Sequence, residues 1–256
     1  MHNHNEFENF LTKTYPFVHK INGFYIIASD EKPRGEYSTG NDSGKDVFEH
    51  SVRLFSNFLD QDEDGKVDQA LLPVVKGLKS RFLFASGYQN FVDQVIEDIY
   101  EKNKNLYVMT MNTDSWPYVA DYNGKGWEIE ALNSSLWRPE NCNALWEEVF
   151  HTITESYSFY DPDFSFSIGK PLRTFMDTDI RDGTYDISEQ NSYENGHYDI
   201  ETAVNEYIHQ IWAIQFAGKE NKLNEHQQKA LQFLKDKGVP MKLNPDYRRM
   251  LGLRLK

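Results

Sequence analysis

Three residues between positions 143 and 157 have the types and spacing of a metal site. Glu147, Glu148 and His151 lie where apolar residues recur at helical spacing, which predicts a helix over residues 143–157. A helix turns about 100° per residue, so His151 lies about 40° and Glu148 about 100° from Glu147. Two side chains four residues apart can bind one ion. We therefore predict Glu147 and His151 as metal ligands; the alternative is an amphipathic helix with a solvated polar face.

A later carboxylate, Glu206, supports the same site. It is the single formal charge in residues 203–217, and apolar side chains extend nearly all round the helix predicted over residues 201–217. A carboxylate buried in such a helix is costly unless it is paired, protonated or bound to a metal. Its partner is either a lysine or arginine, or a metal shared with His151. We predict Glu206 as the third ligand of this metal, with Zn²⁺ or another divalent ion as the cofactor.

An acidic segment, Asp60-Gln61-Asp62-Glu63-Asp64-Gly65-Lys66-Val67-Asp68, carries a second pattern of metal ligands. Carboxylates at alternate positions can converge on one hard cation, and a glycine allows the sharp turn that this requires. The segment matches the first nine positions of an EF-hand calcium loop. The predicted Ca²⁺ ligands are Asp60, Asp62, Asp64, Lys66 through its backbone carbonyl, and Asp68.

This calcium loop departs from its pattern at the twelfth position. Leu71 stands where a bidentate glutamate is expected, so Ca²⁺ binds more weakly or takes a ligand from elsewhere. Residues 47–81 are therefore predicted as a helix–loop–helix subregion in which a structural calcium ion joins two helices. The alternative is a solvated acidic turn held by hydrogen bonds from aspartate side chains.

Together, the ligands in residues 127–217 resemble the metal site of a gluzincin-type zincin. Glu147-Glu148-x-x-His151 is similar to the HExxH motif, with a glutamate replacing its first histidine. The resemblance implies a metallopeptidase-like hydrolase acting on a peptide or protein, with Glu148 as the general base. It also implies an edge strand over residues 127–132 for an extended substrate, and Tyr198 or Tyr193 as an oxyanion stabiliser.

The order of motifs also resembles a family of EF-hand-loop-containing, zincin-like proteins. The matching segments span about residues 24–215, and they are residues 24–29, 60–68, 107–110, 147–154 and 206–212. This resemblance implies a zincin-like fold.

The expected elements form one domain over residues 1–256. Strands are predicted at residues 24–28, 106–111 and 127–132. Helices are predicted at residues 47–59, 71–81, 88–102, 143–157, 170–176, 201–217 and 224–237. Because helices outnumber strands and do not alternate regularly with them, we expect an α+β fold, mostly helical with a small mixed sheet.

The composition and charge of the chain exclude several classes of partner and site. A net charge of −13 repels phosphate backbones, so a nucleic-acid partner is not expected. No apolar run reaches the roughly 18 residues of a membrane span. Cys142 is the only cysteine, which excludes an internal disulfide framework and a cysteine-rich zinc site. The first ten residues lack the basic and apolar regions of a secretory leader, so we expect a cytoplasmic protein or one exported with its leader removed.

Two other functions remain open. One is a non-enzymatic calcium-binding protein on a degenerate zincin-like scaffold, in which clustered aromatic side chains line a groove. The other is a di-iron carboxylate protein, because Glu148-x-x-His151 and Glu206-x-x-His209 both have the Glu-x-x-His spacing of such bundles. That fold requires further carboxylates, for which Glu97 and Glu101 are the candidates.

Overall fold

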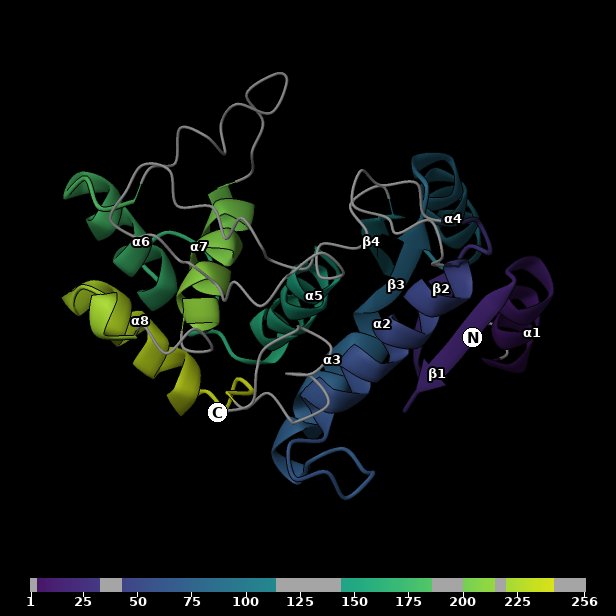
Figure 1. Cartoon of the computed structure of the whole chain (residues 1–256), viewed down its shortest axis with the longest axis horizontal. Helices are drawn as coiled ribbons and strands as arrows, with labels where there is room; N and C mark the ends of the chain where they lie inside the picture. The colour runs from purple at the N-terminus through teal and green to yellow at the C-terminus, as the bar shows by residue number, and fades with distance from the viewer. Residues whose placement is uncertain (1–3, 33–42, 114–143, 186–199, 215–219, 242–256) are drawn as a thin grey trace.

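The chain forms a small sheet with helices on both faces, followed by a further layer of helices. The computed structural model describes residues 4–32, 43–113, 144–185, 200–214 and 220–241 (Figure 1). Within these residues there are eight α-helices and one four-stranded sheet. The predicted α+β class, mostly helical with a small mixed sheet, is confirmed.

The sheet has the strand order β1-β2-β3-β4. Its strands are β1 (Phe17–Ile21), β2 (Phe24–Ala28), β3 (Phe82–Gly87) and β4 (Tyr107–Asn112). β1 pairs with β2 antiparallel, whereas β2, β3 and β4 run parallel. Helices connect the parallel strands, so the middle of the sheet is built from two β–α–β crossovers.

Two of these strands differ from the sequence prediction. β3 was missed because all of its residues are buried, and a strand covered on both faces lacks the alternation of apolar and polar residues. β1 was missed although Asn22 and Gly23, with φ of 49° and 96°, form a two-residue turn of the kind that favours hairpins. The predicted strand at residues 127–132 lies outside the described residues.

The two faces of the sheet contact different helices. Phe24, Ile26 and Phe84 pack on the side of α2 (Gly44–Leu59), α3 (Leu72–Arg81) and α5 (Ala144–Tyr160). Tyr25 and Ile27 alternate with them and pack on the side of α1 (His4–Thr14) and α4 (Gln89–Lys102). This alternation follows from the twofold periodicity of a strand.

A second helical layer lies beyond α5. It contains α6 (Pro171–Arg181), α7 (Ile200–Ile214) and α8 (Glu225–Asp236), and α5 lies between this layer and the sheet (Figure 1). The hydroxyl of Tyr157 on α5 donates to the carbonyl of Gly238 at 2.6 Å, and Nε1 of Trp212 on α7 donates to Pro240 at 2.7 Å. Both bonds hold the segment after α8 against the two helices that carry the candidate site.

No helix among the described residues combines the length and apolar character needed to cross a bilayer.

Candidate metal centre between helices α5 and α7

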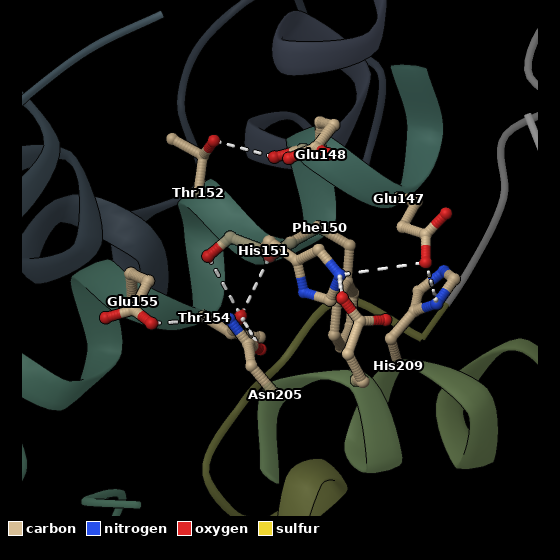
Figure 2. A network of polar contacts seen from close by, with 10 residues as sticks. Glu147, Glu148, Phe150, His151, Thr152, Thr154, Glu155, Asn205 and His209 are labelled. Carbon is tan, nitrogen blue, oxygen red and sulfur yellow. Dashed lines mark hydrogen bonds and ion pairs between the residues drawn. The ribbon is translucent and has the colours of Figure 1, made fainter. Parts of the chain in front are cut away.

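Four potential ligands converge where α5 and α7 face each other. Glu147 and His151 come from α5, and Glu206 and His209 come from α7; one donor atom of each lies within 4.8 Å of the others. Nε2 of His151 is 3.3 Å from Oε1 of Glu206 and 3.9 Å from Oε1 of Glu147. Nδ1 of His209 is 3.6 Å from the same Glu147 oxygen, and Figure 2 shows the carboxylate of Glu147 between the two imidazoles. The structure thus brings together Glu147, His151 and Glu206 as predicted and adds His209.

The site is largely closed to solvent. The side chains of His209 and His151 are 0% and 8% exposed, whereas Glu206 is 18% and Glu147 29% exposed, so solvent reaches the centre mainly through its carboxylates. Among the described residues, no lysine or arginine pairs with Glu206, and the basic group nearest to its carboxylate is Nε2 of His151 at 3.3 Å. The partner of Glu206 in this part of the chain is therefore the imidazole that was predicted to share its metal.

Burial and neighbouring charges shift the pKa values of three groups at this centre. Burial opposes a charge on His151, but the carboxylates of Glu206 and Glu147 outweigh it and raise the pKa of this imidazole. Burial likewise opposes the charge of Glu206, but the attraction and hydrogen bond of His151 outweigh burial and lower the pKa of Glu206. Burial lowers the pKa of His209 to about 4, so this ring is neutral at pH 7. The raised pKa favours a proton on His151, whose positive charge lies between the two carboxylates where a bound cation would also lie.

Glu148, the predicted general base, lies beside the convergent group and is not part of it. Figure 2 shows it on the side of α5 away from His209. Burial, followed by the nearby charges of Glu147 and Glu206, raises the pKa of Glu148 to about 8, although His151 opposes this shift. The carboxyl of Glu148 is thus close enough to be affected by the charges of the centre, although it is not one of the four grouped side chains.

A buried polar contact holds α5 and α7 together one turn from the ligands. The hydroxyl of Thr154 donates to Oδ1 of Asn205 at 2.7 Å, and Nδ2 of Asn205 donates to Glu155 at 3.4 Å (Figure 2). On the apolar side, the ring of Phe150 packs on those of His209 and Trp212 at centroid distances of 5.2 and 4.5 Å. Both contacts fix the spacing of the helices, and therefore the spacing of the ligands.

The acidic loop connects α2 to the 3-10 turn Gln69–Leu71 and α3, as a helix–loop–helix arrangement requires. Donor atoms of Asp60, Asp62 and Asp68 lie within 4.8 Å of one another. Asp64 is not in this group; its carboxylate accepts from the backbone N–H of Lys66 at 2.9 Å and from the Lys66 ammonium at 3.3 Å. Leu71, at the twelfth position, is buried in the core and supplies no ligand.

The loop backbone is organised by the same aspartates. The N–H of Gly65 donates to Asp60 at 2.8 Å, and the N–H of Asp64 donates to Asp60 and Asp62 at 3.1 and 3.2 Å. Gly65 has a φ of 83°, a left-handed conformation that favours glycine. These hydrogen bonds shape the turn in which the carboxylates of Asp60, Asp62 and Asp68 lie close together.

Some predicted residues lie outside the described residues. These are Tyr198 and Tyr193, the strand at residues 127–132, and Cys142. The structure does not bring Glu97 and Glu101 of the di-iron alternative to the centre; they are exposed on α4, which covers the opposite face of the sheet from α5. His209 was named in the sequence only through that alternative, although its position three residues after Glu206 places it on the same face of the helix.

Comparison with protein-family models, curated proteins and solved structures gave no match for this chain.

Proposed function

We propose that this protein is a metal-dependent hydrolase of the metallopeptidase-like class, on a zincin-like scaffold, with a structural calcium loop. The observation that carries the proposal is the convergence of Glu147, His151 and Glu206 from two separate helices. Metal–ligand bonds of about 2.0–2.2 Å place neighbouring ligand atoms roughly 3.3 Å apart in a tetrahedral site. Nε2 of His151 is 3.3 Å from the Glu206 oxygen and 3.9 Å from the Glu147 oxygen, which is close to this geometry.

Hydrolysis is the reaction that we propose for this centre. A divalent ion held by these ligands would polarise the substrate carbonyl and acidify water. Glu148, next to a ligand in sequence, would accept the proton of the attacking water; a cation nearby would shift this carboxyl toward the charged form that a base requires. Two carboxylates would neutralise a divalent ion more than a single carboxylate would, which would make water at the ion less acidic, so a metal other than zinc is a candidate. Tyr198 remains the proposed oxyanion stabiliser.

The calcium component of the proposal rests on Asp60, Asp62 and Asp68. Their oxygens lie within 4.8 Å of one another, and the loop follows α2 directly. An ion there would hold the end of α2 against the start of α3, which is a structural role. We propose weak binding, because Leu71 leaves the bidentate position without a ligand.

Elemental analysis of the purified protein tests the metal centre. We expect about one equivalent of transition metal in the wild type and loss of that metal in Glu206→Gln, which keeps the shape of the side chain and removes its charge. Glu201→Gln, on the exposed face of the same helix, is the matched control and should retain the metal. A wild type that binds no transition metal after incubation with Zn²⁺, Mn²⁺ or Co²⁺ would contradict the proposal.

Cleavage of a fluorogenic peptide library tests the hydrolase. Glu148→Gln should keep the metal and lose most of the activity, since removal of a positioned base typically costs about 10²–10⁴-fold in rate. If the metal-loaded wild type and Glu148→Gln both leave every peptide intact, the metal centre stands and the hydrolase proposal fails.

A further inference from the structure

His209 occupies a position that a three-ligand site leaves without explanation. It follows Glu206 by three residues on α7, which places both on one face of the helix. Its Nδ1 is 3.6 Å from Oε1 of Glu147, and it belongs to the group whose donor atoms lie within 4.8 Å of one another. A fully buried imidazole facing two carboxylates and a second imidazole is suitably placed to contact the same ion.

We propose that His209 is a fourth protein ligand, and that the activity of the centre therefore depends on which divalent ion occupies it. The part that concerns activity rests on the proposed function above; the part that concerns ligation does not.

The dependence follows from coordination number. Zinc in proteins is almost always four-coordinate, and its catalytic sites keep one of the four positions for water. Glu147, His151, Glu206 and His209 would fill all four positions and close a zinc site. Mn²⁺, Fe²⁺ and Co²⁺ accept six ligands, so the same four side chains leave two positions for water and substrate. Two imidazole nitrogens and two carboxylate oxygens also suit these ions.

A different role for His209 would produce a similar position. Carboxylates that bind metals are usually held by hydrogen bonds from neighbouring groups, and Nδ1 of His209 could hold Glu147 in this way. The ring is fixed in either role, because Phe150 and Trp212 pack against it at centroid distances of 5.2 and 6.3 Å. The two roles differ in the number of imidazoles bound to the ion, which is two for a ligand and one for a group that only positions Glu147.

X-ray absorption spectroscopy of the zinc-loaded protein counts these imidazoles. We expect two in the wild type and one in His209→Asn, whose amide can still donate to Glu147. His19→Asn, an exposed histidine on β1, is the matched control and should leave the count at two. One imidazole in the wild type overturns the inference whether or not the variant folds. A wild type that binds no zinc or other divalent ion would instead contradict the proposed function.

Activity after metal exchange tests the dependence on the ion. Wild-type protein stripped of metal and loaded with Mn²⁺ or Co²⁺ should hydrolyse peptides at least about tenfold faster than the zinc-loaded form, which corresponds to about 1.4 kcal/mol in the barrier. In His209→Asn, the hydrolysis rate of the zinc-loaded form should rise relative to that of the manganese-loaded form, because one coordination position of the zinc ion becomes open. Equal rates of the zinc- and manganese-loaded wild type would overturn the dependence. If no ion supports hydrolysis, the proposed hydrolase function is contradicted. Whether His209 binds the ion is then decided by the imidazole count alone.

Discussion

Thr154 on α5 and Asn205 on α7 are joined by a buried hydrogen bond of 2.7 Å. Thr154 follows His151 by three residues, and Asn205 directly precedes Glu206, so this bond sets the distance between a ligand on each helix (Figure 2). The geometry of the candidate centre therefore depends on a polar contact that is not itself a ligand.

Replacing Thr154 with valine should weaken both the fold and the centre. The substitution keeps the shape and removes the donor to Asn205, so we expect about 1–3 kcal/mol less stability in urea unfolding. Metal affinity should fall by about 10–100-fold in titrations, since groups that position ligands have effects of that size. Thr152→Val is the control, because the hydroxyl of Thr152 donates within its own helix, to the backbone carbonyl of Glu148 at 2.6 Å. Equal metal affinity in both variants would show that the Thr154–Asn205 bond does not position the ligands.

Gly77 lies where α3 packs tightly against Ser156 of α5. A Cβ at this position would overlap Oγ of Ser156 and lie 3.1 Å from the Ser156 carbonyl oxygen. Helix propensity alone predicts that Gly77→Ala stabilises the protein by about 1 kcal/mol. We expect the opposite sign, a loss of about 1–3 kcal/mol from overpacking, measured by thermal or urea unfolding. Ser80→Ala, on the exposed side of α3, should cause no loss. A more stable Gly77→Ala variant would contradict this expectation, because it would mean that α3 and α5 can move apart without a loss of folding free energy.

The acidic loop should make stability depend on calcium. An ion that binds only the folded state adds about 2.7 kcal/mol at a concentration 100 times its Kd, so the melting temperature should rise with Ca²⁺. Asp62→Ala should abolish this rise and leave the melting temperature without calcium nearly unchanged. Glu63→Gln should keep the rise, because Glu63 is exposed and not part of the gathered carboxylates. Identical melting of the wild type with and without Ca²⁺ would remove the calcium component of the proposal.

The ion pair of Asp161 and Lys237 should make stability fall in acid. Burial opposes the charge of Asp161, but the hydrogen bond from Lys237 at 2.7 Å and that from the backbone N–H of Asp163 outweigh it and lower the pKa of Asp161. A carboxyl whose pKa is lower in the folded state stabilises the fold above its unfolded pKa and loses this effect as the pH falls through the folded pKa.

Asp161→Asn should therefore be less stable than the wild type at pH 7, by no more than about 1 kcal/mol, because the pair is partly solvated. The difference should disappear in strong acid, where Asp161 is protonated. Asp163→Asn is the control and should have a smaller effect, since its carboxylate is 3.6 Å from Lys237 and 64% exposed. If the stability difference between Asp161→Asn and the wild type does not change with pH, the lost stability comes from packing and not from the ion pair.

Part of the fold followed from local patterns in the sequence. The helices around the site were predicted closely, with residues 143–157 expected and Ala144–Tyr160 observed, because apolar spacing along one helix is a local property. β3 was not predicted, since it is buried on both faces and its sequence does not alternate. Its position between β2 and β4 is decided by pairing with strands more than twenty residues away.

The candidate centre was likewise predicted only in part from the sequence. Local spacing was enough to group Glu147 with His151, and the apolar helix around Glu206 was enough to require a partner for its charge. The identity of that partner, and the addition of His209, depended on how α5 and α7 pack against each other. Such contacts join residues about fifty positions apart, and no periodicity within either helix encodes the distance between them. The sequence alone thus determined which side chains need a cation, whereas the tertiary structure decided which of them can share one.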